Sequence, residues 1–131
     1  MTAPTRPLPR FPEPDTEPFW RATREHRLLF QVDPVTGEVV FFPRRGADRA
    51  LEWRESAGAG VIYTFTVIRQ HGHPYFRAKA PYVVAFVDLD EGFRILAEVV
   101  ADPDTVHIGA RVQVDWDDHE DVSVPVFRQV E

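Results

Sequence analysis

The sequence contains no cysteine among its 131 residues. This absence excludes disulfide bonds, thiolate zinc sites, iron–sulfur clusters and cysteine nucleophiles, so any metal would need His and carboxylate ligands. Long hydrophobic runs are also lacking, because no stretch approaches the roughly eighteen apolar residues of a membrane-spanning helix. The N-terminus is rich in proline and lacks the basic and then apolar pattern of a secretory signal. We therefore expect a cytoplasmic protein that binds no membrane.

Positive charge is scarce as well. The chain has 15 Lys and Arg against 21 Asp and Glu, which gives a net charge of −6. A field of this sign repels polyanions, and binding to nucleic acid depends on neutralising phosphates. Nucleic acid is therefore not an expected partner.

Leucine is rare beside the β-branched residues. Val and Ile together number 22 against six Leu. β-Branched side chains lose little freedom in an extended backbone and pack well on a pleated surface. The composition predicts a mostly β protein, and the length is typical of one domain.

Proline is concentrated at the start, where six of the twelve prolines fall within the first eighteen residues. Proline fixes φ and removes a hydrogen-bond donor, so residues 1–14 are predicted to form an extended arm. The arm is either a strap over a partner subunit or a surface lead-in. A short helix of about two turns should follow, because Asp15 or Thr16 can cap it and Glu17 and Pro18 suit its first turn.

Two apolar runs, residues 28–32 and 38–42, flank the turn sequence of residues 33–37. Proline at the second turn position and Gly37 at the last are typical of a type I turn with a bulge, so a hairpin is expected. Its packing should rest on Phe30, Val32, Val40 and Phe42. The expected segments are an arm with a short helix over 1–27, this hairpin over 28–50, and a closed β-barrel over 51–131.

The second half carries the denser strand signal. Residues 61–69 are apolar on both parities, residues 82–89 and 93–100 flank a tight turn, and two further strands are expected near 112–117 and 122–128. A long curled strand followed by a hairpin suits a small closed antiparallel barrel, and an OB-fold matches best.

The loop over residues 71–82 is the most unusual stretch and the main candidate site. It is long for a compact domain, and long loops tend to bind something. The candidate partner- or ligand-binding residues are His71, His73, Pro74, Tyr75, Phe76, Pro81 and Tyr82. A His base with a Tyr acid is one alternative, although no carboxylate lies nearby in sequence to orient the His. A loop that packs its own aromatic rings is another, and we assign no catalytic residue.

Metal sites are not expected. His71 and His73 would share one face of a strand, but two ligands are too few. The acidic run from Asp115 to Asp121 lacks the glycine and the ligand spacing of a calcium loop, so a solvated hairpin tip is the better interpretation.

Several short motifs, in order, carry a resemblance to a known family. They are Pro12-Glu13-Pro14, Pro18-Phe19-Trp20, Leu28-Leu29-Phe30-Gln31, Phe42-Pro43-Arg44, Leu51-Glu52-Trp53, the run over 60–67, His73-Pro74-Tyr75-Phe76, the run over 80–85, Ile108-Gly109 and Pro125-Val126-Phe127-Arg128. In these motifs the chain resembles the OB-fold acyl-CoA-associated family, domain of unknown function thirty-five, over nearly its whole length.

Members of that family usually carry a zinc ribbon with two Cys-x-x-Cys knuckles. Asp33 and Thr36 stand here where the first pair would be, and the second knuckle is shortened to residues 45–49. Asp and Thr do not replace thiolates as zinc ligands. We therefore expect a metal-free ribbon-like hairpin, no zinc and no tightly bound cofactor.

The resemblance implies an accessory subunit without catalysis of its own. It would bind a thiolase-like enzyme in a hetero-oligomer and help to form the acyl-CoA site for thiolytic acyl transfer or retro-aldol cleavage, as in steroid side-chain breakdown. The coenzyme A thioester would be a shared ligand, and residues 71–82 lie where partner contacts are expected. Arg44, Arg45 and Arg49 are candidates for the coenzyme A phosphates, because guanidinium groups suit them, or else form a solvated loop.

Three alternatives remain. A stand-alone module for an acyl-CoA or another small ligand would use the barrel mouth as its pocket. A nucleic-acid-binding OB domain is disfavoured by the charge. A small enzyme lacks a recognisable triad, motif or metal set.

Overall fold

The computed structural model describes residues 4–9, 13–43 and 50–130. Its elements confirm the expected mostly β fold with a closed OB-like barrel. In chain order they are α1 (Glu17–Thr23), β1 (Leu28–Val32), β2 (Val39–Val40), β3 (Glu52–Ser56), β4 (Ala59–Ile68), α2 (Pro74–Lys79), β5 (Tyr82–Leu89), β6 (Arg94–Val100), β7 (Arg111–Asp118) and β8 (Ser123–Gln129).

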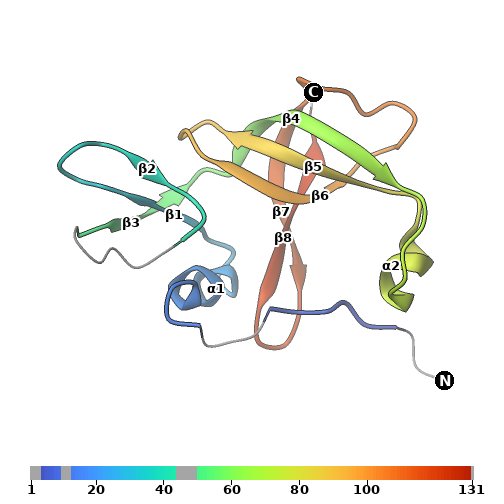
Figure 1. The fold of residues 1–131 in the computed structure, drawn as a ribbon, viewed down its shortest axis with the longest axis horizontal. Helices are drawn as coiled ribbons and strands as arrows, with labels where there is room; N and C mark the ends of the chain where they lie inside the picture. The colour runs from blue at the N-terminus through green and yellow to red at the C-terminus, as the bar shows by residue number, and fades with distance from the viewer. Residues whose placement is uncertain (1–3, 10–12, 44–49, 131) are drawn as a thin grey trace.

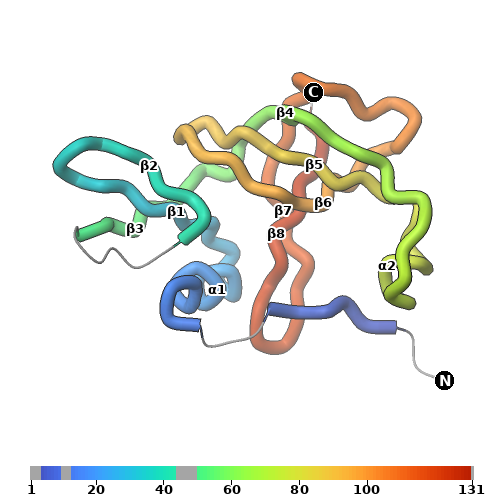
Figure 2. The backbone as a smooth tube through the Cα atoms, viewed as in Figure 1, coloured from blue at the N-terminus to red at the C-terminus, as the bar shows by residue number. Residues whose placement is uncertain are grey.

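The barrel contains five strands in the order β4-β5-β6-β8-β7 (Figure 1). The tube in Figure 2 shows β7 and β8 crossing behind β5 and β6, so that the sheet curls onto itself. Strands β5 and β6 pair as the predicted hairpin. The barrel interior is filled mainly by β-branched side chains that alternate with outward residues, namely Val83, Val87, Val99 and Val112, and by Phe127. Each of these is at most 1% exposed.

A second, smaller sheet has the order β2-β1-β3 and lies beside the barrel. The assignment of residues 51–131 to the barrel was therefore wrong for β3, which pairs with β1 from Leu28↔Ser56 to Val32↔Glu52. All five residues of β1 are buried, so its backbone N–H and C=O groups need hydrogen-bond partners on both edges of the strand. These partners are β2 on one edge and β3 on the other. The barrel begins at Ala59.

The turn of the hairpin is held as the sequence predicts. The carboxylate of Asp33 accepts hydrogen bonds from the backbone amides of Val35 (2.9 Å) and Thr36 (3.3 Å), and Gly37 has φ +78°. Phe30, Val32 and Val40 are buried. Phe42 is 52% exposed, so its expected role in the hairpin core was wrong, and its ring instead stands beside Phe19 and Phe41.

Helix α1 is anchored to the end of the barrel. Thr16 precedes it without a side-chain capping bond, and Pro18 sits in the first turn. Thr23 is fully buried, donates from Oγ1 to the Trp20 carbonyl (2.6 Å) and accepts from the amide of Ser123 in β8 (3.1 Å). This bond fixes α1 against the β7–β8 hairpin.

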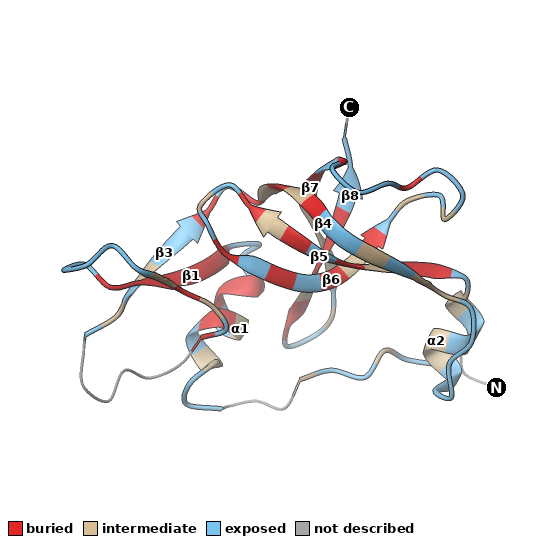
Figure 3. Ribbon diagram, turned by 45° about the horizontal axis from the view of Figure 1, so that its top comes forward, coloured by how far each residue is buried: buried red, intermediate tan, exposed pale blue. Residues whose placement is uncertain are grey.

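The segment over 71–82 is not a plain loop, as the sequence interpretation had it, because it contains α2. His73 caps this helix by accepting from the amide of Tyr75 through Nδ1 (3.1 Å), and Pro74 occupies the first turn. Proline there loses no intrahelical bond and presets φ. Helix α2 buries none of its residues, and Figure 3 shows it in the colours of intermediate and exposed side chains.

Candidate functional site

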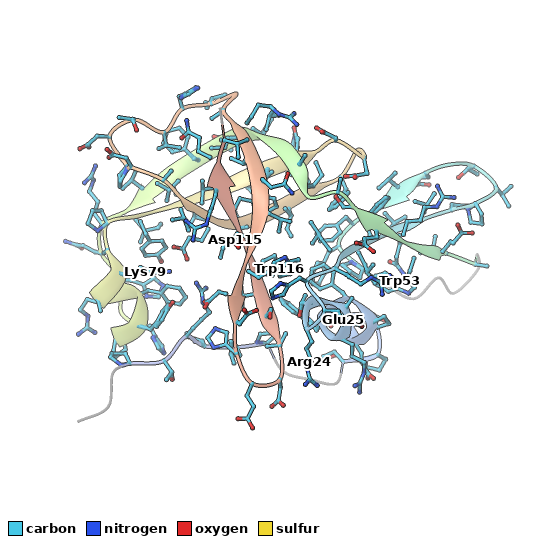
Figure 4. All side chains as sticks on the ribbon, turned by 180° about the vertical axis from the view of Figure 1, so that it is seen from behind. Arg24, Glu25, Trp53, Lys79, Asp115 and Trp116 are labelled. Carbon is cyan, nitrogen blue, oxygen red and sulfur yellow. The ribbon has the colours of Figure 1, made fainter. Side chains whose placement is uncertain are left out.

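An apolar pocket of about 440 Å³ lies between the two helices, against strands β5, β6 and β8. Figure 4 shows Lys79 of α2 on one side of the β7–β8 hairpin and Arg24 and Glu25, at the end of α1, on the other. The pocket is lined by residues from the arm, α1, the segment after β2, α2, β5, β6 and β8, namely Arg6, Phe19, Trp20, Phe41, Phe42, Phe76, Tyr82, Val84, Ile95, Leu96, Ala97, Glu98, Val124, Pro125 and Val126.

Aromatic rings form the wall on the α1 side. Phe19 meets Trp20 edge-on with centroids 4.9 Å apart, and it meets Phe41 in the same way at 5.9 Å. Such edge-to-face pairs are favourable beyond the area they bury. Phe19 is 1% exposed and belongs to the core, so this wall is anchored in the core at Phe19.

The opposite corner of the pocket is charged. Arg6 of the arm donates from Nε to Asp117 (2.6 Å) and from Nη2 to Glu98 (2.9 Å), and its side chain is only 8% exposed. Lys79 of α2 donates to both carboxylate oxygens of Glu98, at 2.6 and 2.8 Å. Glu98 therefore joins the arm and α2 to β6.

Arg6 also lies against two aromatic faces of α2. Its guanidinium carbon is 5.2 Å from the ring centre of Tyr75 and 5.6 Å from that of Phe76. Burial lowers the pKa of Arg6, but the hydrogen bonds to Glu98 and Asp117 outweigh it, so that the pKa is raised. The arm is thus packed on its own chain at Arg6.

Tyr82 stays neutral in this environment. Burial, followed by the nearby Glu98 carboxylate, raises the pKa of its phenol. Its ring stacks on Phe76 with centroids 5.7 Å apart. The residue thus presents an uncharged ring and hydroxyl.

Of the residues singled out in 71–82, the structure brings three to the pocket corner. Phe76 and Tyr82 line the pocket, and Tyr75 covers Arg6 and Lys79. Pro74 and Pro81 are exposed. Arg44, Arg45 and Arg49, the coenzyme A phosphate candidates, lie outside the described residues.

The two histidines are engaged in local turn structure. His71 accepts from the amide of His73 through Nδ1 (3.0 Å), as His73 does from Tyr75. The ring of His71 stands 4.8 Å from that of Phe76. Within the described ranges, no group of three or more His, Asp or Glu side chains is placed to hold a metal ion.

Sequence reasoning missed Arg6, Glu98 and the aromatic wall of the pocket. Arg6 and Glu98 are 92 positions apart, and no local pattern reports such a pair. A weak signal was present, because Glu98 is a lone acid in the otherwise apolar end of its strand. A carboxylate that is buried within an apolar strand needs a cation as its partner.

The acidic run is more structured than a solvated tip. Asp115 pairs with Arg128, Asp117 with Arg6, and Asp118 accepts from His26 and from the hydroxyl of Ser123 at 2.6 Å each. His26 also stacks on Trp116 with centroids 5.3 Å apart. These contacts connect the end of α1 to the barrel.

We predict a pH-dependent contribution from Asp118. Hydrogen bonds from Ser123 and His26 lower the pKa of its carboxyl. A carboxyl whose pKa is lower in the folded state stabilises the fold at any pH above its unfolded-state pKa of about 3.9. This stabilisation is lost as the pH falls through the folded-state pKa. Asp118→Asn should therefore be less stable than the parent at pH 7, and the two should converge in acid. Urea unfolding at pH 7 and pH 3 measures this, and a constant difference would contradict it.

Comparisons with known proteins agree on one family. The family model for "ChsH2, C-terminal OB-fold domain" matches residues 53–117. A "DUF35 domain-containing scaffold protein" of Methanocaldococcus jannaschii is 35% identical over 102 residues, which are 72% of this chain and 71% of the relative. A solved structure described as "Ltp2-ChsH2(DUF35) aldolase" has a TM-score of 0.79 and 30% identity, covering 95% of this chain and 98% of that one.

A "3-oxo-4,17-pregnadiene-20-carboxyl-CoA hydratase alpha subunit" of Mycobacterium tuberculosis is 31% identical over 115 residues, or 84% of this chain. The chain spans 36% of that subunit and 23% of a second hydratase alpha subunit that it matches. No helix in the described part of the chain is long and apolar enough to span a membrane.

Proposed function

The chain belongs to the DUF35 OB-fold family, and on this premise we propose that it is a non-catalytic accessory subunit of a thiolase-like enzyme. It binds the enzyme in a hetero-oligomer and helps to form its acyl-CoA site. The single observation that carries the proposal is the likeness over 95% of this chain to one chain of the Ltp2-ChsH2(DUF35) aldolase. The scaffold-protein name of the archaeal relative points the same way.

The geometry of the chain supports a binding role over a catalytic one. The histidine nitrogens His71 Nδ1 and His73 Nδ1 accept backbone hydrogen bonds, and Glu98 is held by two cations. A general base needs an available lone pair within reach of a substrate proton. We therefore assign the chemistry to the partner, with thiolytic acyl transfer or retro-aldol cleavage of coenzyme A thioesters as the reaction class. Steroid-derived acyl groups are favoured by the name of the mycobacterial relative.

The partner surface is assigned to α2 and its flanks. The helix buries none of its residues, yet carries two adjacent aromatic rings, Tyr75 and Phe76, with Arg77 exposed beside them. Aromatic and arginine side chains are the common anchors of protein interfaces. The residues from His71 to Tyr82 thus form the proposed contact.

The test of the accessory role is a tagged pull-down of the full chain from its native organism or from co-expression with a thiolase-like protein encoded beside it. We expect mass spectrometry to identify that partner, and we expect its activity on acyl-CoA esters to require this chain. The pure chain alone should be inactive on the same esters. Recovery of the chain without a partner, under conditions that preserve complexes, would instead favour a stand-alone ligand-binding module.

We predict that the double substitution Tyr75→Ala and Phe76→Ala weakens association with the partner at least about tenfold. Interface aromatics of this kind each cost about 1–2 kcal/mol or more on truncation, and about 1.4 kcal/mol is tenfold in affinity. The barrel core should be unaffected, because neither ring is buried, although the variant also removes Phe76 from the pocket lining and from its stack on Tyr82. Titration calorimetry of the complex measures the change.

A matched control is Tyr63→Ala. This ring is 51% exposed and lies on β4, where the guanidinium of Arg94 covers it at 3.5 Å. The control should bind the partner like the parent chain. Unchanged association of the double variant would remove α2 from the interface.

A further inference from the structure

The pocket beside the barrel has the size and lining of a small-molecule site. Its volume of about 440 Å³ lies within the range of roughly 300–1,000 Å³ that is typical of ligand pockets. Its walls come from seven separate parts of this one chain and include five aromatic rings, those of Phe19, Trp20, Phe41, Phe42 and Phe76, besides Tyr82. The site is therefore formed without a contribution from a partner.

The charges at its corner indicate what kind of ligand fits. The carboxylates of Glu98 and Asp117 are both paired with Arg6, and Glu98 is paired with Lys79 as well. Neither an anion nor a cation would find an unpaired opposite charge there, and burying a charge without a partner is costly. Tyr82, whose phenol is neutral at pH 7, adds one uncharged polar group to the lining. The pocket thus suits an uncharged, mostly hydrocarbon group.

The side chains of the outer barrel face extend the apolar surface to the pocket. Leu96 and Phe86 are paired across β6 and β5, and they are 58% and 42% exposed although both are large and apolar. Leu96 also lines the pocket, so the exposed strip runs into it. These exposed apolar side chains adjoin the pocket lining at Leu96.

We propose that this pocket binds the hydrocarbon portion of a small molecule, a bulky or medium-length acyl group, with Arg6 and the arm as one wall. The inference deepens the proposed function, because it places the acyl part of the shared ligand on this chain. It does not require a partner, since the lining is complete in the single chain.

Trp20 allows a direct test, because it lines the pocket whereas Trp53 and Trp116 do not. Bromine quenches tryptophan fluorescence on contact, so the probes are 10-bromodecanol, which is neutral, and 10-bromodecanoate, which is charged at pH 7. We expect saturable quenching of the full chain by the alcohol, at least about tenfold weaker binding of the carboxylate, and loss of the saturable component in Trp20→Phe. Displacement of the alcohol by decanoyl-CoA but not by coenzyme A would identify the thioester as a source of the acyl group.

Matched variants on one strand locate the site. Leu96→Glu places a charge in the lining and should weaken binding of the alcohol at least about tenfold. Val100→Glu is the control, since Val100 lies on β6 with the same outward parity, is 41% exposed and does not line the pocket. Its affinity should stay within about twofold of the parent chain. Circular dichroism confirms that both variants are folded.

Three outcomes would overturn the proposal. These are absence of saturable quenching in the folded chain, equal weakening by both variants, and persistence of the quenching in Trp20→Phe. None of them involves the partner. A chain that co-purifies with a thiolase-like enzyme but fails this test keeps the accessory role, with the pocket then serving as a docking surface for the partner. A chain that binds the alcohol but recovers no partner keeps the pocket and loses the accessory role.

Discussion

Replacing Glu98 by Ala is expected to lower the free energy of unfolding by about 3 kcal/mol, because the partners of a buried carboxylate are left without it. Glu98 is 11% exposed in its side chain and receives three hydrogen bonds, one from Arg6 and two from Lys79. Arg6 is 8% exposed, so solvent does not replace the lost carboxylate. Out of a total stability of roughly 5–15 kcal/mol, this is a large fraction. Urea unfolding followed by fluorescence measures the change.

The comparison variant is Glu52→Ala. Glu52 pairs with Arg54 at 3.1 Å, but both side chains are 51% exposed, and exposed pairs contribute about 0–1 kcal/mol. This variant should unfold within about 0.5 kcal/mol of the parent. If Glu98→Ala behaves the same way, the arm and α2 are held by contacts other than the Glu98 carboxylate.

Glu98→Ala also tests whether Glu98 stabilises only the attachment of α2 or the whole fold. Helix α2 has no buried residue, so its attachment depends on the Lys79 bonds to Glu98 and on ring contacts such as that between Phe76 and Tyr82. Hydrogen exchange of the α2 amides should therefore accelerate more in Glu98→Ala than exchange in β5, whose strand is paired on both sides. A uniform acceleration would mean that Glu98 serves the whole fold and not this corner.

The strands were predictable because their signal is local. Alternation in residues 93–100 and the apolar run over 82–89 each mark a strand, and the tight turn at Asp90 to Gly92 brings the two together. The pairing between strands that are distant in sequence was not predictable in this way. The local sequence of β3 does not indicate that its partner is β1 instead of a barrel strand. The folded structure shows that β1 pairs with β2 on one edge and with β3 on the other.

Helix α2 was missed although its end signals are in the sequence. Pro74 in the first turn is a regular helix start and Ala80-Pro81 is a regular stop, but His73 is not one of the usual capping residues. Gly72 and two prolines within ten residues favoured a loop. A six-residue helix gives periodicity too little length to show.

The pocket follows from tertiary placement. Phe76 and Tyr82 were singled out as aromatic residues in a long loop, and the structure places both in the lining. Arg6 and Trp20 come from segments whose sequence predicts an arm and a helix, which says nothing of where they pack. The sequence of the arm was equally consistent with a strap over another subunit and with a surface lead-in. The long-range pairs of Arg6 with Glu98 and Asp117 show that the arm packs on its own chain at Arg6.

Gly60→Ala is expected to destabilise the barrel by about 3 kcal/mol, because an added methyl group has no room where the barrel closes. Gly60 pairs with Leu89 of β5 on one side and Val112 of β7 on the other. A Cβ there would stand 3.0 Å from the backbone carbon of Asp88, nearer still to its carbonyl oxygen, and 3.1 Å from Val87 Cγ1. Backbone atoms cannot turn away as a flexible side chain can, so β4 and β5 must separate.

Gly72→Ala is the matched control for that effect. Nothing lies within 4 Å of a Cβ at Gly72, and its φ is not in the left-handed region. The same methyl group should therefore leave stability unchanged or raise it slightly, because it restricts the unfolded chain. A loss of about 3 kcal/mol corresponds to a fall of about 10 °C in Tm for a domain of this size. Equal melting temperatures of the two variants would contradict this prediction. They would mean that β4 and β5 can separate at Gly60 without a measurable loss of stability.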